Sequence, residues 1–119
     1  MYRIAKKFTF SASHQIKGLP ETHKCARLHG HNYAVEVILE SPELNAVGFI
    51  RDYAELDALQ DYIKAKFDHR HLNDVVGDDF TTAENLARHF YDWCRAQWPE
   101  TSAVRVSENI NTWAEYNGD

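Results

Sequence analysis

Two segments near the start of the chain alternate hydrophobic and polar side chains with a period of two. The first covers residues 2–14, and its polar face is rich in Ser and Thr. Its apolar face is formed by Phe8, Phe10, Ala12 and His14. The second covers residues 31–40 and begins with His31 on its more apolar face. This alternation predicts two half-buried β-strands, each of which points a histidine toward the core.

The middle of the chain changes to a helical period. Residues 15–30 contain two glycines and a proline and are expected to form a loop. After the break at Ser41-Pro42-Glu43, hydrophobic residues recur every three or four positions from Tyr53 to Phe67. This spacing predicts an amphipathic helix of about 15 residues. The polar residues 68–79 are expected to form a second loop.

A second helix and two further strands are predicted in the last third. Thr81-Thr82-Ala83-Glu84 matches a capping box with Thr81 as the cap, and the helix that follows should end at Pro99. Alternation over Ala103–Glu108 predicts a strand, and a last strand is expected at about Thr112–Tyr116. The order ββααββ indicates one α+β domain over residues 1–119, an antiparallel sheet covered by helices on one side.

Composition narrows the class of protein. The formal charge of −5 argues against a nucleic-acid-binding surface. No apolar run approaches the roughly 20 residues that span a bilayer, and the first residues lack the apolar core of a signal peptide. The chain has only two cysteines, and they lie in different contexts, which argues against a disulfide framework. We therefore expect a cytoplasmic protein that does not bind membranes.

A thiol and two imidazoles, which can all bind metals, lie close together in Cys25-Ala-Arg-Leu-His29-Gly-His31. Two histidines at i and i+2 in a strand leave the same face and can share one metal ion. The inward-facing His14 is the best candidate for a third ligand. Three imidazoles with an open fourth position are typical of catalytic zinc, although the ligands alone leave iron or nickel open. The alternative is a set of strand-edge imidazoles with ordinary hydrogen bonds.

The two cysteines differ in their surroundings. Cys25 has His23, Lys24 and Arg27 as neighbours, and this positive environment favours the thiolate. Cys25 is therefore either a fourth zinc ligand in a closed site or a free nucleophile or base beside the metal. Cys94 lies on the apolar stripe of the second helix and is expected to pack in the core.

Three further residues can carry acid–base or binding chemistry. Asp68 directly precedes His69, so the carboxylate could orient the imidazole as a proton relay. The alternative for His69 and for His71 is simple solvation at the surface. Glu108 shares a strand face with valines, where burial is expected. A buried carboxylate needs a partner, either a ligand with amide-like donors or a salt bridge within the chain.

Taken together, these residues resemble the 6-pyruvoyl-tetrahydropterin synthase and 6-carboxytetrahydropterin synthase family over essentially the whole chain. The matching motifs are Phe10-Ser-Ala-Ser-His14, Cys25-x₃-His29-Gly-His31-Asn-Tyr, Gly48-Phe-Ile-x-Asp52-Tyr, Phe67-Asp68-His69-x₂-Leu72-Asn73, Thr82-Ala-Glu84-Asn85-Leu86 and Val106-Ser-Glu108. The Cys-x₃-His-Gly-His spacing is similar to the bacterial carboxy branch, which serves queuosine (7-deazaguanine) biosynthesis. Arg70-His71 departs from the usual pair and leaves open which imidazole acts as the relay.

The resemblance implies a tunnelling fold whose subunits join their sheets into a barrel and stack as a homohexamer, with sites at subunit interfaces. It implies Zn²⁺ on His14, His29 and His31, and 7,8-dihydroneopterin triphosphate as the substrate. The implied products are 6-carboxy-5,6,7,8-tetrahydropterin, acetaldehyde and triphosphate.

The resemblance also assigns roles to individual side chains. Cys25 would be the base that shuttles protons, activated by His69 and oriented by Asp68. Glu108 would bind the amino and N–H groups of the pterin. Thr82 and Glu84 would touch the pterin only by analogy, because the capping box explains them without a ligand. Lys24 and Arg27 are the candidates to contact the triphosphate.

Two other functions are compatible with the sequence. A 6-pyruvoyl-tetrahydropterin synthase would use the same residues and keep the full side chain of the substrate. A non-catalytic zinc-binding module would use Cys25 as a fourth ligand in a closed site. A zinc hydrolase is less compatible, because the chain has no His-Glu-x-x-His pattern.

Overall fold

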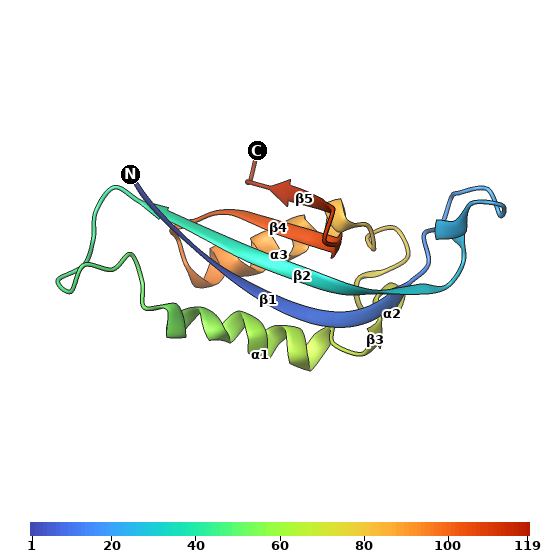
Figure 1. The fold of residues 1–119 in the computed structure, drawn as a ribbon, viewed down its shortest axis with the longest axis horizontal. Coiled ribbons are helices and arrows are strands. Elements are labelled where there is room, and N and C mark those ends of the chain that lie inside the picture. Colours follow the sequence, from blue (N-terminus) through green and yellow to red (C-terminus); the bar gives the residue numbers. More distant parts are fainter.

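A long antiparallel pair of strands lies at the centre of the fold. The computed structural model describes all residues 1–119. Strands β1 (Tyr2–His14) and β2 (His29–Ser41) pair along their whole length, from Tyr2 opposite Ser41 to His14 opposite His29 (Figure 1). This register places two of the predicted metal ligands side by side at one end of the sheet.

Three shorter strands complete the sheet, in the order β3-β1-β2-β4-β5. Strands β4 (Thr101–Asn109) and β5 (Thr112–Tyr116) continue the antiparallel pattern beyond β2. Strand β3 (Arg70–His71) pairs in parallel with Ala12 and Ser13 at the other edge. The expected sheet is therefore confirmed, with one short parallel strand added to it.

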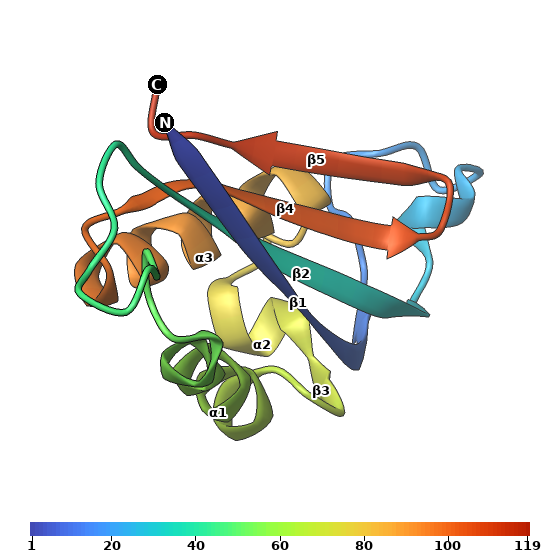
Figure 2. The same ribbon diagram turned by 60° about the vertical axis from the view of Figure 1, so that its left-hand side comes forward.

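The helices α1 (Asp57–Lys66), α2 (Leu72–Val76) and α3 (Ala83–Gln97) pack on one face of this sheet (Figure 2). Two 3₁₀ turns, η1 (Lys24–Ala26) and η2 (Tyr53–Leu56), precede β2 and α1. The α+β class and the helices on one face are confirmed. No helix is long and apolar enough to cross a membrane.

One hydrophobic cluster of 19 buried residues lies between the sheet and the helices. At its centre, the ring of Phe10 stacks on Tyr33 at 5.0 Å and meets Phe67 and Phe90 edge-on at 6.0 and 6.2 Å. Offset and edge-to-face aromatic contacts add to the free energy gained from burial. Cys94 is fully buried in this cluster, as its place on the helical stripe predicted.

Two loops predicted from the sequence are shorter than expected. The loop after β1 ends at residue 28, because the pairing of His14 with His29 extends β2 beyond the predicted start. The predicted loop 68–79 contains β3 and α2. A two-residue strand and a five-residue helix are too short for a period to be recognised.

The start of each long helix also differs from the prediction. Thr82, and not Thr81, caps α3, since its side chain accepts a hydrogen bond from the Asn85 backbone N–H. Thr81 is instead buried. Tyr53 is 55% exposed because it lies in the 3₁₀ turn before α1, where the helical period does not yet hold.

Helices α1 and α3 are joined by a polar contact inside their aromatic interface. The Tyr62 hydroxyl lies 2.8 Å from His89 Nε2, and the Tyr62 ring stacks on Trp93. Burial lowers the pKa of His89 from its ordinary value of 6.5, although the charge of Asp92 opposes this shift. Neutral His89 is therefore favoured in the folded chain.

We expect the free energy of unfolding to decrease as the pH falls below 6.5. Below this value the unfolded chain takes up a proton that folded His89 does not, which favours unfolding. His89→Gln should reduce this acid destabilisation without removing it, because the variant keeps the contribution of every other histidine. Urea denaturation of both proteins at pH 7.5 and pH 5.5 measures the difference. Equal pH dependence in the two proteins would contradict the prediction.

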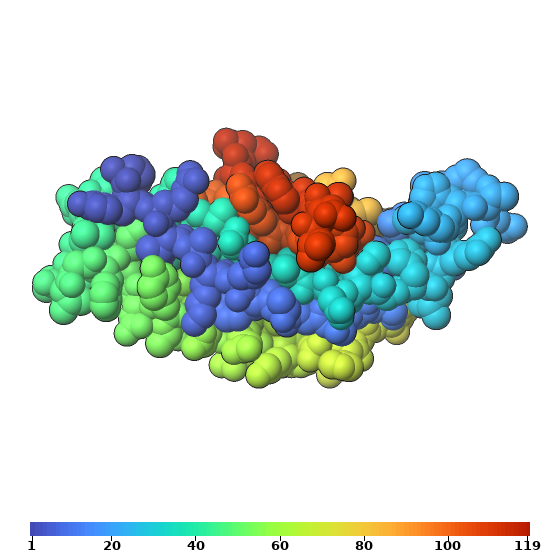
Figure 3. All heavy atoms as spheres, viewed as in Figure 1, coloured from blue at the N-terminus to red at the C-terminus, as the bar shows by residue number.

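The loop between β1 and β2 projects from one end of the molecule. Residues 15–28 extend beyond the sheet and the helices and carry η1 at their base (light blue in Figure 3). The carbonyl of Cys25 accepts a hydrogen bond from Ile16 N–H at 3.0 Å, which closes this loop. The loop therefore brings Cys25 back to the sheet end where the histidines lie.

Candidate metal and ligand site

Three imidazoles converge at the end of the β1–β2 pair. His14 ends β1 and is fully buried, while His29 and His31 lie on β2 and are partly exposed. The ring centres of His14 and His29 are 4.4 Å apart, and that of His31 lies 5.1 Å from His14 and 4.9 Å from His29. The expectation that both strands deliver histidines to one point is confirmed in position.

Backbone carbonyls fix the orientation of two of these rings. His14 Nδ1 lies 2.9 Å from the Thr81 carbonyl oxygen, and His29 Nδ1 lies 2.6 Å from that of Arg27. A carbonyl only accepts, so each Nδ1 carries a hydrogen, and in the neutral ring the Nε2 keeps its lone pair. Hydrogen bonds of this kind orient metal-binding histidines in proteins.

The Nε2 atoms of His14 and His29 lie 2.8 Å apart. Two lone pairs at this distance repel each other, and a cation between them removes the repulsion. Burial lowers the pKa of His14, although its bond to Thr81 opposes the shift, and burial lowers the pKa of His31 as well. Because the His14 ring tends to be neutral, a metal ion suits this position better than a proton.

The donor set fits a small metal ion. One nitrogen from each of His14, His29 and His31 lies within 4.8 Å of the other two. Nitrogen ligands on a tetrahedral zinc with bonds of about 2.1 Å are about 3.4 Å apart. The three histidines could therefore hold a metal with one coordination position open.

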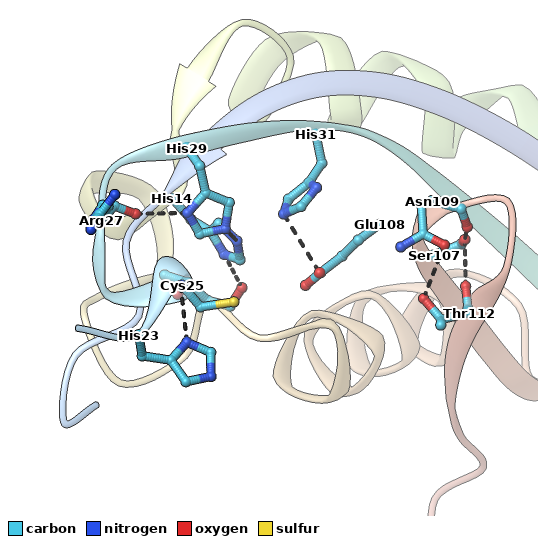
Figure 4. A network of polar contacts seen from close by, with 11 residues as sticks. His14, His23, Cys25, Arg27, His29, His31, Ser107, Glu108, Asn109 and Thr112 are labelled. Carbon is cyan, nitrogen blue, oxygen red and sulfur yellow. Dashed lines mark hydrogen bonds and ion pairs between the residues drawn. The ribbon is translucent and has the colours of Figure 1, made fainter. Parts of the chain in front are cut away.

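Cys25 lies next to this group without belonging to it. Its sulfur is not among the donor atoms that lie within 4.8 Å of one another. His23 Nδ1 accepts a hydrogen bond from the Cys25 backbone N–H at 3.0 Å, which fixes the turn. Figure 4 shows the half-buried thiol on the side of the turn that faces the histidines and Glu108. This position suits a free thiol rather than a fourth ligand.

Glu108 occupies the other side of the site. It follows Val104 and Val106 on the inner face of β4, and its Oε2 lies 3.5 Å from His31 Nε2 (Figure 4). Burial lowers the pKa of His31 and favours its neutral ring, although the charge of Glu108 opposes this shift, so the contact is not a charged ion pair. The carboxylate can therefore still bind a ligand.

The pair Asp68 and His69 is held against β1. The Asp68 carboxylate accepts a hydrogen bond from the Ser11 backbone N–H at 3.0 Å and lies 3.0 Å from His69 Nδ1. The Ser11 bond, and then the His69 side chain, lower the pKa of Asp68, which favours the carboxylate.

The backbone of His69 is strained. Its φ of +58° lies in the left-handed region, which costs about 1–3 kcal/mol for many residues. A hydrogen bond from its N–H to the Ser11 carbonyl at 2.6 Å holds this conformation. The side chain of His69 is 80% exposed, so it is presented to the surface rather than packed.

His69 lies on the face of the sheet opposite to the side chains of the histidine cluster, although the groove that it lines also reaches His31. It lines a shallow groove with the polar face of β1 and β2 and with β3. The groove side chains include Ser11, Ser13, Asn32, Arg70 and His71. Side chains alternate along a strand, so Ser13 and Asn32 leave the face opposite to His14 and His31. His71 is fixed there by its Nδ1, 3.0 Å from the Ser13 hydroxyl.

The remaining predicted residues lie at the surface. Lys24 and Arg27 are exposed in the loop after β1, and no side-chain partner fixes either of them. Two contributors were missed from the sequence: the Thr81 and Arg27 carbonyls that orient His14 and His29. Every residue carries a carbonyl, so no residue type could have revealed them.

Comparison with known proteins identifies the family. A family model described as 6-pyruvoyl tetrahydropterin synthase matches residues 3–119. The chain belongs to this family. A 6-carboxy-5,6,7,8-tetrahydropterin synthase of Synechocystis is 34% identical over 122 residues, covering 98% of this chain and 93% of the relative. The resemblance expected from the motifs is confirmed.

Other proteins similar to this chain carry different names. A dihydroneopterin monophosphate aldolase of Pyrococcus furiosus is 31% identical and covers 82% of this chain and 78% of its own length. The solved structure of the Caenorhabditis elegans 6-pyruvoyl tetrahydropterin synthase has a TM-score of 0.84 at 24% identity, covering 99% of this chain and 96% of that chain. This likeness confirms the tunnelling fold.

Proposed function

We propose that this member of the 6-pyruvoyl tetrahydropterin synthase family is a cytoplasmic, zinc-dependent 6-carboxy-5,6,7,8-tetrahydropterin synthase. It would convert 7,8-dihydroneopterin triphosphate and water into 6-carboxytetrahydropterin, acetaldehyde and triphosphate for queuosine (7-deazaguanine) biosynthesis. The observation that carries the proposal is the convergence of His14, His29 and His31 beside the Cys25 thiol and the Glu108 carboxylate. The carboxy branch is favoured by the Cys-x₃-His-Gly-His spacing and by the Synechocystis relative.

The side chains divide the chemistry between binding and proton transfer. Glu108 accepts hydrogen bonds from the amino and N–H groups of the pterin and fixes the ring. Bound zinc supplies Lewis acidity that makes the C–H bonds beside the substrate hydroxyls easier to ionise. Cys25 removes and returns protons at these carbons, and His69 takes the proton of the thiol. Asp68 holds His69 in the required orientation.

We propose that each site is built from two copies of the chain within a homohexamer. His69 and the histidine cluster lie on opposite faces of the sheet, so the His69 of one copy would serve the Cys25 of its neighbour. Lys24 and Arg27 are exposed near the thiol and are the proposed contacts of the triphosphate.

Product analysis tests the reaction. Zinc-loaded protein is incubated with 7,8-dihydroneopterin triphosphate, and the products are identified by mass spectrometry. We expect 6-carboxytetrahydropterin together with acetaldehyde. A pterin that keeps its three-carbon side chain would instead establish the pyruvoyl synthase. Activity only on dihydroneopterin monophosphate would match the Pyrococcus relative, and a lack of activity on both substrates would refute pterin chemistry.

Mixing two inactive variants tests the two-chain site. Cys25→Ala retains His69, while His69→Asn retains Cys25 and tolerates the left-handed backbone. Each variant should be inactive alone. Unfolded together and refolded at equal concentrations, they should recover up to about a quarter of the wild-type activity, because random assembly pairs an intact Cys25 with an intact His69 in that fraction. A mixture as inactive as its components would place both residues of the site in one chain.

A further inference from the structure

The chain contains two buried side-chain atoms without a hydrogen-bond partner, and both belong to the neighbourhood of Glu108. They are His31 Nε2 and the Tyr33 hydroxyl oxygen. A metal accounts for the first, because it would take the imidazole lone pair. The second is unexplained by the proposed reaction. Buried polar groups are nearly always paired, and an unpaired hydroxyl makes tyrosine less stable than phenylalanine at such a position.

The ring of Tyr33 is held in place on both sides. It is fully buried, stacks on Phe10 at 5.0 Å, and meets His31 and His14 edge-on at 5.4 and 6.0 Å. These contacts leave the hydroxyl little freedom to turn toward another partner. A hydrogen-bond partner for this hydroxyl must therefore be a group that can itself move toward Tyr33.

Glu108 is placed to become that partner. Ala34 pairs with Ser107, which sets Tyr33 and Glu108 at neighbouring positions on the inner faces of β2 and β4. A tyrosine hydroxyl carries its proton at neutral pH and can donate it to a carboxylate. In the free chain the carboxylate is instead directed to His31 Nε2, at 3.5 Å.

We propose that Tyr33 is a positioning residue that holds Glu108 in its ligand-binding orientation. Once His31 Nε2 serves as a metal ligand, Glu108 loses its contact there, and its carboxylate accepts a hydrogen bond from the Tyr33 hydroxyl. The other carboxylate oxygen is then free to receive the N–H groups of a pterin. This inference rests on the proposed function and adds a link between metal loading and ligand recognition.

Tyr62 supplies a matched control for the substitution Tyr33→Phe. Its hydroxyl is already paired with His89 at 2.8 Å, between α1 and α3 and outside the site. Tyr62→Phe should lower the melting temperature and leave pterin binding unchanged. Tyr33→Phe should do the reverse, with a melting temperature equal to or above that of the wild type and weaker pterin binding.

The experiment titrates 7,8-dihydroneopterin into wild type, Tyr33→Phe and Tyr62→Phe by fluorescence, with and without zinc. We expect Tyr33→Phe to weaken binding about tenfold in the zinc-loaded protein and less in the zinc-free protein, where Glu108 still faces His31. Zinc content should equal that of the wild type. With the triphosphate substrate, KM should rise more than kcat falls, which a purely structural defect would not produce.

Two results would overturn the inference alone. One is an affinity of Tyr33→Phe equal to that of the wild type in zinc-loaded protein. The other is a melting temperature lowered as in Tyr62→Phe, which would show that the Tyr33 hydroxyl is already paired in the free chain. A wild type that neither binds nor converts the pterin would instead refute the proposed function, and the inference with it.

Discussion

Cys25→Ala is expected to abolish turnover and to leave zinc in place. The thiol is the only proposed proton-transfer group on the side of the turn that faces the histidines, so its loss should reduce kcat by about 10²–10⁴-fold. The three histidines do not depend on the sulfur, because it is outside their donor group. Steady-state kinetics and metal analysis of the same preparation test both statements together.

Cys94→Ala is the matched control for this substitution. Cys94 is fully buried on α3, and burial raises the pKa of its thiol to about 12, so it is not a thiolate at neutral pH. Removing it should lower stability by roughly 1 kcal/mol through a small cavity and leave kcat unchanged. If Cys25→Ala instead loses zinc and unfolds, Cys25 is a structural ligand and the closed-site alternative is correct.

The part of the site that follows strand periodicity could be predicted from the sequence. Alternation over residues 2–14 was sufficient to place His14 on the core side, and the position of Glu108 after two valines pointed its carboxylate inward. Both predictions rest on a period of two, which holds over long strands. The strand pattern alone therefore predicts the side of the sheet on which the candidate ligand His14 lies.

The parts that depend on register or on single backbone angles could not be predicted. The opposite faces of His69 and His14 follow from the pairing of β3 with β1, which involves only Ala12 and Ser13. The left-handed conformation of His69 is imposed by Ser11, 58 positions away along the chain. Neither leaves a periodic signal. The unpaired hydroxyl of Tyr33 likewise appears only when all its neighbours are in place.

His29→Ala should remove zinc and turnover together without unfolding the chain. Of the three candidate ligands, His29 and His31 are partly exposed and His14 is fully buried, so His29 can be replaced with little loss of packing. Two remaining imidazoles should bind zinc at least about 100-fold more weakly than three, since even the loss of a group that only orients a ligand weakens binding 10–100-fold.

His71→Ala is the matched control for the loss of the ligand. Its ring is bonded to Ser13 on the opposite face of the sheet, so this variant should retain zinc. Metal analysis after dialysis, with circular dichroism to check folding, compares the two proteins. If His29→Ala keeps its zinc, the ion is bound elsewhere. The 2.8 Å approach of the His14 and His29 nitrogens would then reflect a shared proton rather than a metal site.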